Sequence, residues 1–203
     1  MGRALYDCVE EASREGENLK GMAFDGETVR DMDASGIEFE EVRFTGCRFE
    51  TCDFSEASFY STVFQNCDFS NCHFEDSYWK RCSLEGCKGD GANFSRSRVK
   101  ESAFLACTFS YANFSRAGID NTSMTDCNLK EAFLTEVKFK KPVMRNTVLT
   151  GADFFRTPLE GLDLSDCTID GLIVSESYKE LQGLIISPEQ AVDLVRLLKV
   201  KFA

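Results

Sequence analysis

Large apolar side chains recur at every fifth residue along most of the chain. Of the 32 positions on this count from Leu19 to Val174, 30 carry a large apolar residue, and 15 of these are Phe. A step of five scatters side chains around an α-helix and sends them to opposite faces of a flat strand, so neither period explains the pattern. The remaining solution is a backbone that bends once per five residues, which is a solenoid with a shared interior.

The residue two places before each large one is small almost throughout, as a narrow interior requires, and nine of the ten cysteines occupy it. Stacked, parallel thiols suit neither a disulfide nor a tetrahedral metal site, so we expect buried, reduced cysteines and no metal or cofactor. Six of them are separated by multiples of 20 residues, which favours four five-residue units per coil and about eight coils: Cys47, Cys67, Cys87, Cys107, Cys127 and Cys167.

Two residues interrupt the pattern. Gly89 takes a large inward position between Phe69 and Phe109 of the same column, so we expect a cavity or an inward shift of the chain there. Pro142 takes a small inward position, and its missing N–H is expected to remove one hydrogen bond of the ladder and to bend the corner. In both cases the alternative is a surface shaped for a partner.

Both ends of a solenoid must be covered, because an open coil exposes unpaired backbone groups and apolar rings. We predict an N-terminal cap over residues 1–18, the repeat over 19–177, and a C-terminal helix and tail over 178–203. A short amphipathic helix in the N-terminal cap is expected to bury Leu5, Cys8, Val9 and Ala12.

The C-terminal helix is predicted to begin at Ser187 as N-cap, Pro188 as N1 and Gln190 as N3, and to extend to about Lys199. Apolar residues follow on one helical face and then alternate as in a strand. They serve either as a simple cap or as a dimer interface: Ala191, Leu194, Val195, Leu198, Val200 and Phe202.

Short motifs connect this pattern with a known family. The segments CDFSE, CDFSN, ANFSR, CNLKE and ADFFR resemble the consensus A(D/N)LXX of the pentapeptide-repeat proteins. The resemblance implies an all-β fold, a right-handed quadrilateral parallel β-helix, in agreement with four units per coil. The segments TPLEGLDLSDCTIDGL and LQGLIISPEQAVDLVRLLKV resemble the C-terminal end of the Qnr-type quinolone-resistance subgroup. This implies a homodimer joined through the C-terminal element, and a rod that binds DNA gyrase or topoisomerase IV by imitating DNA and modulates fluoroquinolone sensitivity.

The net charge of −11 is concentrated at one end, since residues 1–76 contain 18 acidic and six basic side chains. An acidic, regular rod repels nucleic acid and competes with it for a basic cleft. We therefore expect no direct binding of nucleic acid. The predicted partner-binding surface consists of acidic residues on two adjacent faces: Asp33, Asp53, Glu56, Glu75 and Asp76 on one, and Glu38, Glu40 and Glu41 on the next.

Two features depart from a uniformly anionic imitation of DNA. The middle of the chain places seven cations along one face: Lys80, Arg81, Arg98, Lys100, Lys138, Lys140 and Lys141. The unbroken repeat also leaves out the projecting loops that interrupt many Qnr rods and that are implicated in protecting the enzyme. Two alternatives stay open, namely a scaffold for an unidentified protein partner and a solvated acidic surface with no partner.

Catalysis is not expected, because the single histidine, His73, lies on a solvated face, the cysteines point inward, and no phosphate-binding glycine motif occurs. No apolar run approaches the roughly 20 residues that span a bilayer, and the N-terminal segment is too polar for a secretory signal. The sequence therefore predicts a cytoplasmic protein that does not enter a membrane.

Overall fold

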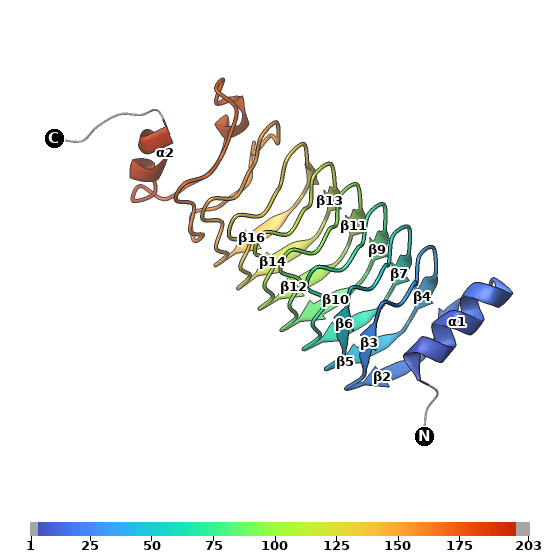
Figure 1. The fold of residues 1–203 in the computed structure, drawn as a ribbon. Coiled ribbons are helices and arrows are strands. Elements are labelled where there is room, and N and C mark those ends of the chain that lie inside the picture. The colour runs from blue at the N-terminus through green and yellow to red at the C-terminus, as the bar shows by residue number, and fades with distance from the viewer. Residues whose placement is uncertain (1–3, 198–203) are drawn as a thin grey trace.

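The chain forms a four-sided rod that carries a helix at each end (Figure 1). The structure is a computed structural model that describes residues 4–197. At most corners, the residue two places after the large inward one has a left-handed backbone, as at Asp31 (φ 48°), Glu41 (φ 55°) and Thr51 (φ 54°). The predicted bend once per five residues is therefore confirmed.

Short parallel strands occupy three of the four sides. The first seven-stranded sheet consists of β1 (Leu19–Lys20), β4 (Glu38–Glu40), β7 (Ser58–Tyr60), β9 (Tyr78–Lys80), β11 (Arg98–Lys100), β13 (Gly118–Asp120) and β15 (Lys138–Lys140). The second consists of β2 (Ala23–Asp25), β5 (Arg43–Thr45), β8 (Val63–Gln65), β10 (Ser83–Glu85), β12 (Ala103–Leu105), β14 (Ser123–Thr125) and β16 (Val143–Arg145). The third side carries β3 (Thr28–Arg30) and β6 (Arg48–Glu50), and isolated bridges join the coils elsewhere.

Neighbouring strands are related by a shift of 20 residues, so that Phe39 lies beside Phe59 and Phe59 beside Trp79. This register confirms four five-residue units per coil. The strand ladders extend over about six turns, fewer than the eight coils expected, and isolated bridges alone join the coils beyond β16. Pro158 explains the end of the first sheet, because Lys138, one coil earlier, donates its N–H to the carbonyl oxygen of Ala117 and proline has no N–H to donate.

The interior consists of stacked aromatic rings and small residues. On the fourth side, successive rings lie 4.8 to 5.0 Å apart between centroids and nearly parallel, in the column Phe54, Phe74, Phe94 and Phe114. All ten cysteines are buried and unpaired with one another. Their thiols are satisfied by backbone oxygens, as where Cys47 Sγ donates to Phe24 O at 3.4 Å, and burial raises the pKa of Cys82 to about 11.

The expected cavity at Gly89 is not present, because the rings above and below close over the glycine. Phe69 and Phe109 are two coils apart, yet their centroids lie 6.2 Å from each other. A Cβ atom at Gly89 would lie 2.6 Å from the Phe69 ring and 2.7 Å from the Phe109 ring. The Gly89 N–H still donates to the Thr108 carbonyl oxygen at 2.8 Å, so the ladder passes this position unbroken.

The expectation for Pro142 was wrong, because the N–H groups of its column bond side chains instead of the backbone ladder. Cys82 N–H donates to the Ser102 hydroxyl at 3.0 Å, and the next coils repeat this arrangement. Beside the proline, Val143 N–H retains its bond to the Thr122 carbonyl oxygen at 3.0 Å. Proline therefore costs no ladder hydrogen bond here.

The two ends are covered as expected. Helix α1 (Leu5–Glu15) buries the four residues predicted for it, Leu5, Cys8, Val9 and Ala12. At the other end, the 3-10 helix η1 (Lys179–Leu181) precedes α2 (Ala191–Leu197). The predicted end of this helix near Lys199 lies outside the described residues.

Gln190 performs the predicted N3 role and a second one. Its Oε1 accepts the N–H of Ser187 at 2.7 Å, while its Nε2 donates to the carbonyl oxygens of Leu164 and Cys167 at 2.8 and 2.6 Å. The side chain thus satisfies backbone groups that the last coil would otherwise leave open.

Asp163 ties the last coil together on its outside. The hydroxyl and N–H of Ser165, together with the guanidinium of Arg145, lower the pKa of Asp163 to about 2. Its backbone pairs with Ile185 as the chain leaves the solenoid.

Candidate acidic interface

The predicted acidic surface begins with a column of aspartates on the fourth side. Asp33 and Asp53 are partners in adjacent coils. Each carboxylate accepts the N–H of the residue two places on, Ser35 at 3.0 Å and Ser55 at 2.8 Å, which fixes its direction. The hydroxyl and N–H of Ser35 also lower the pKa of Asp33. The column is therefore preorganised in the ionised form.

The remaining predicted acids divide into paired and free carboxylates. Glu40 forms an ion pair with Lys20 at 2.8 Å, and Asp76 binds the Arg96 guanidinium through both oxygens, with a shortest distance of 2.7 Å. Glu38 accepts a hydrogen bond from Asn18, and Glu75 accepts them from Ser55 and Asn93 and lies 3.3 Å from His73. Across residues 4–197, four of the eight predicted carboxylates have no cationic partner: Asp33, Glu41, Asp53 and Glu56.

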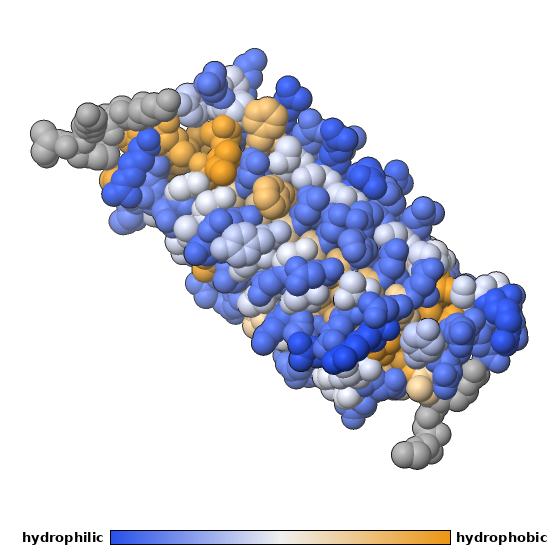
Figure 2. Space-filling model, viewed as in Figure 1, coloured by the Kyte–Doolittle hydropathy of each residue, from blue (hydrophilic) through white to orange (hydrophobic). Residues whose placement is uncertain are grey.

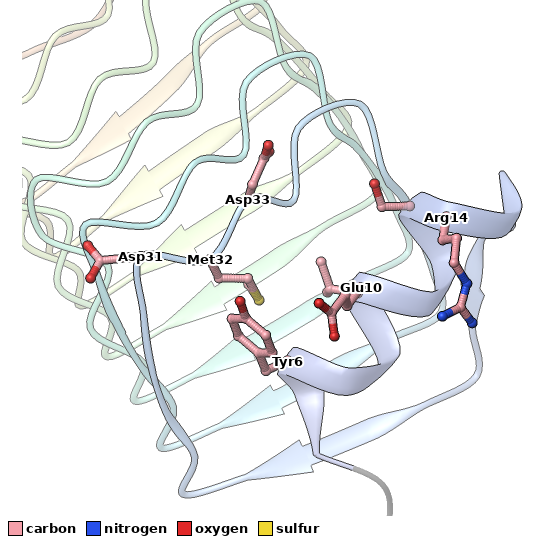
Figure 3. A pocket seen from close by; sticks show the side chains of 8 residues that line it. Tyr6, Glu10, Arg14, Asp31, Met32 and Asp33 are labelled. Atoms are coloured by element: carbon pink, nitrogen blue, oxygen red, sulfur yellow. The ribbon is translucent and has the colours of Figure 1, made fainter.

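A hollow of about 310 Å³ lies where this surface meets the N-terminal helix (Figure 3). Tyr6 and Glu10 project from α1 toward Met32, while Asp31 and Asp33 point outward on either side of it. Glu10 and Asp31 were not among the predicted site residues. Their signal was the position of the helix over the first coil, which the repeat pattern alone does not contain.

The first sheet carries both signs of charge along one side of the rod. Glu38 and Glu40 belong to β4, whereas Arg98, Lys100 and Lys138 occupy the same columns on later strands. The acidic surface is therefore confined to the N-terminal half and turns basic within a few coils. The sequence indicated both clusters, and the structure places them on the same side.

The C-terminal end presents apolar side chains instead of charges, as Figure 2 shows near the end that carries α2. Of the predicted dimer residues, Ala191 is exposed, while Leu194 and Val195 are half-buried and Leu194 packs against the core. The other three lie outside the described residues: Leu198, Val200 and Phe202. The structure adds two exposed side chains that the helical spacing did not single out, Ile185 (49 % exposed) and Val192 (41 % exposed).

Other classes of site were sought in the same part of the chain. Among the described residues, no three His, Cys, Asp or Glu side chains come together in a way that would hold a metal ion. No helix in that range is long and apolar enough to cross a membrane.

Comparison with known proteins agrees with this geometry. The family model "Pentapeptide repeats (8 copies)" matches residues 37–76, and the model "Pentapeptide repeat region" matches residues 57–134. Two trypsin-treated variants of QnrB1, described as a plasmid-mediated fluoroquinolone resistance protein, are similar in fold, with TM-scores of 0.53 and 0.50 at 21 % and 20 % identity. Each alignment covers 92 % of this chain, and 97 % and 98 % of the respective QnrB1 chain. No curated protein matches the sequence.

Proposed function

Because the chain belongs to the pentapeptide-repeat proteins, we propose that it binds a type II topoisomerase, DNA gyrase or topoisomerase IV, in place of DNA and thereby modulates fluoroquinolone sensitivity. Solenoids of this family are structural and interaction proteins, and the fold is that of a fluoroquinolone resistance protein. The observation that carries the proposal is the set of four carboxylates without cationic partners in the N-terminal half: Asp33, Glu41, Asp53 and Glu56.

The physical reason is competition for a cationic cleft. Duplex DNA carries about one charge per 1.7 Å of its axis, and proteins bind it largely through lysine and arginine contacts to these charges. Coils of the rod repeat at roughly 4.8 Å, so carboxylates on adjacent coils form a rigid, regularly spaced anionic array. A carboxylate already bound to arginine, such as Asp76, contributes little to such an array.

The experiment measures inhibition of gyrase supercoiling, and displacement of DNA from gyrase, by purified rod with and without a fluoroquinolone. Neutralising Asp33, Asp53 and Glu56 to Asn, Asn and Gln is expected to weaken displacement at least tenfold. Asp153→Asn is the matched control for one position, because Asp153 belongs to the same column and accepts the N–H of Phe155 in the same way, but lies near the other end. Full displacement by the triple variant would refute the acidic interface, and absence of any effect of the wild-type rod would refute the topoisomerase proposal.

We also propose that the chain forms a homodimer through its C-terminal element. The exposed apolar side chains Ile185 and Val192 would be covered in such a dimer, while Leu194 already packs against the core. Val192→Glu is therefore a cleaner test than Leu194→Glu, which would also disturb the cap. Light scattering is expected to give a dimeric mass for the wild type and a monomeric mass for Val192→Glu, and an unchanged dimer would exclude this interface.

The alternative, a scaffold for an unrelated protein partner, is favoured by one observation. Three exposed apolar side chains surround a hollow of about 340 Å³ in the C-terminal half, namely Tyr111 (52 % exposed), Phe133 (47 %) and Ile173 (51 %). Exposed apolar clusters often mark protein-binding surfaces. A Phe133→Ser variant that keeps its effect on gyrase would separate this surface from the acidic one.

A further inference from the structure

A second charged feature of the rod is a hollow of about 510 Å³ on the basic part of the first sheet. It is centred on β13, where Gly118 stands between Arg98 and Lys138 in one column of the ladder. A Cβ atom at Gly118 would contact nothing within 4 Å, so the missing side chain leaves open space between two long cationic ones. The hollow therefore follows from a single glycine in a strand whose neighbours carry large residues.

The charge of this hollow is strongly positive, since its lining includes six cations and two acids. The acids are already neutralised, because Asp76 binds Arg96 and Asp120 binds Lys140 at 2.9 Å. A third cation, Arg116, binds Glu136.

Three cations of the lining have no acidic partner among residues 4–197: Arg98, Lys100 and Lys138. Lys100 lies over the ring of Tyr78, with its Nζ 5.8 Å from the centroid. Three like charges on adjacent coils repel one another, and an anion placed between them would relieve that repulsion.

We propose that this hollow binds a small polyanion that carries two or more phosphate groups. Arginine presents a planar fork that matches phosphate oxygens, and lysine adds compact charges from either side. The hollow has the volume of a small-molecule site, with an open floor at Gly118 that lets an anion approach the sheet. A long nucleic acid is disfavoured, because the same side of the rod carries Glu38 and Glu40 a few coils away and the net charge is −11.

The test is isothermal titration calorimetry with inorganic pyrophosphate and tripolyphosphate at low salt. Neutralising Arg98, Lys100 and Lys138 to Gln is expected to weaken binding at least tenfold. Gly118→Leu keeps every charge but fills the hollow, and the same loss is expected. The matched control neutralises Arg43, Lys88 and Lys179, which are exposed, lie elsewhere on the rod and have no ion pair in its described part. Circular dichroism and the melting temperature check that all variants fold.

Loss in the first triple variant and in Gly118→Leu, with the control triple unaffected, supports the site. Equal losses in both triple variants would show nonspecific charge attraction and overturn the proposal, as would absence of wild-type binding. A short DNA duplex that binds more tightly than tripolyphosphate and is lost in the same variants would assign the surface to nucleic acid and also overturn it. The first triple variant is expected to displace DNA from gyrase as the wild type does, so this inference and the topoisomerase proposal fail separately.

Discussion

Replacing Gly89 by alanine tests the packing of the core most directly, because two simple arguments predict opposite signs. By the repeat pattern, Gly89 is a gap in a column of large residues, so an added methyl group should stabilise the rod. The structure predicts the reverse, since the new Cβ would lie 2.6 Å from the Phe69 ring and 2.7 Å from the Phe109 ring. Ordinary contacts between carbon atoms are 3.5 to 4.0 Å, so each ring overlaps the methyl group by about 1 Å.

Neither ring has free space to move into. Phe69 packs edge-on against Phe74 with centroids 5.5 Å apart, and Phe109 packs in the same way against Phe114 at 5.7 Å. Overpacking of a filled core typically costs 1 to 3 kcal/mol, so we expect a loss of about 2 kcal/mol in the free energy of unfolding. For a chain of this size, that loss corresponds to a fall of roughly 4 to 8 °C in melting temperature.

Urea denaturation and thermal melting by circular dichroism measure the effect. Gly118→Ala is the matched control, because it has no contact within 4 Å in the same strand system and should change stability by less than about 1 kcal/mol. Combining Gly89→Ala with Phe109→Leu should recover part of the loss, since the smaller side chain gives the methyl group room. A Gly89→Ala variant as stable as the wild type would refute the account of ring closure over the glycine.

Two further predictions concern polar groups. Ser97 has a buried hydroxyl without a hydrogen-bond partner, so Ser97→Ala should raise the free energy of unfolding by about 1 kcal/mol in urea denaturation. Ser77, one coil earlier in the same column, accepts the indole N–H of Trp79 at 2.8 Å, so Ser77→Ala should lower it by 1 to 3 kcal/mol, and equal effects of the two variants would contradict this reasoning. The pKa of Asp163 is lowered to about 2, so its contribution to stability is present above about pH 4 and is lost as the pH falls toward 2. Stability measured between pH 5 and pH 2 should therefore decline less steeply in Asp163→Asn, and identical slopes would exclude this contribution.

The solenoid could be predicted from the sequence because every inward residue obeys one count. Phe39 and Phe59 lie side by side for the same reason that they are 20 residues apart. The prediction failed where side chains respond to one another. A glycine between two phenylalanines can mean a void or two rings in contact, and only the ring positions decide. Likewise, the column of Pro142 uses side-chain hydroxyls as acceptors, which the proline rule does not include.

The acidic interface was predicted in composition but not in its state of pairing. Asp76 and Arg96 are 20 residues apart, as are Lys20 and Glu40, so a search for opposite charges at this interval would have found these ion pairs. The hollow beside α1 could not be found this way, because the position of a capping helix depends on packing that has no repeat.

The 20-residue register also makes the coil a unit of length. Excising one such segment from the middle would bring every column back into line and shorten the rod by a single level, with each side keeping its orientation to both ends. Excising five residues would instead rotate everything beyond the cut by a quarter turn, so that the carboxylates near α1 and the cations around Gly118 would face different directions. Rod length and the relative bearing of its surfaces can thus change independently, according to how many residues are gained or lost.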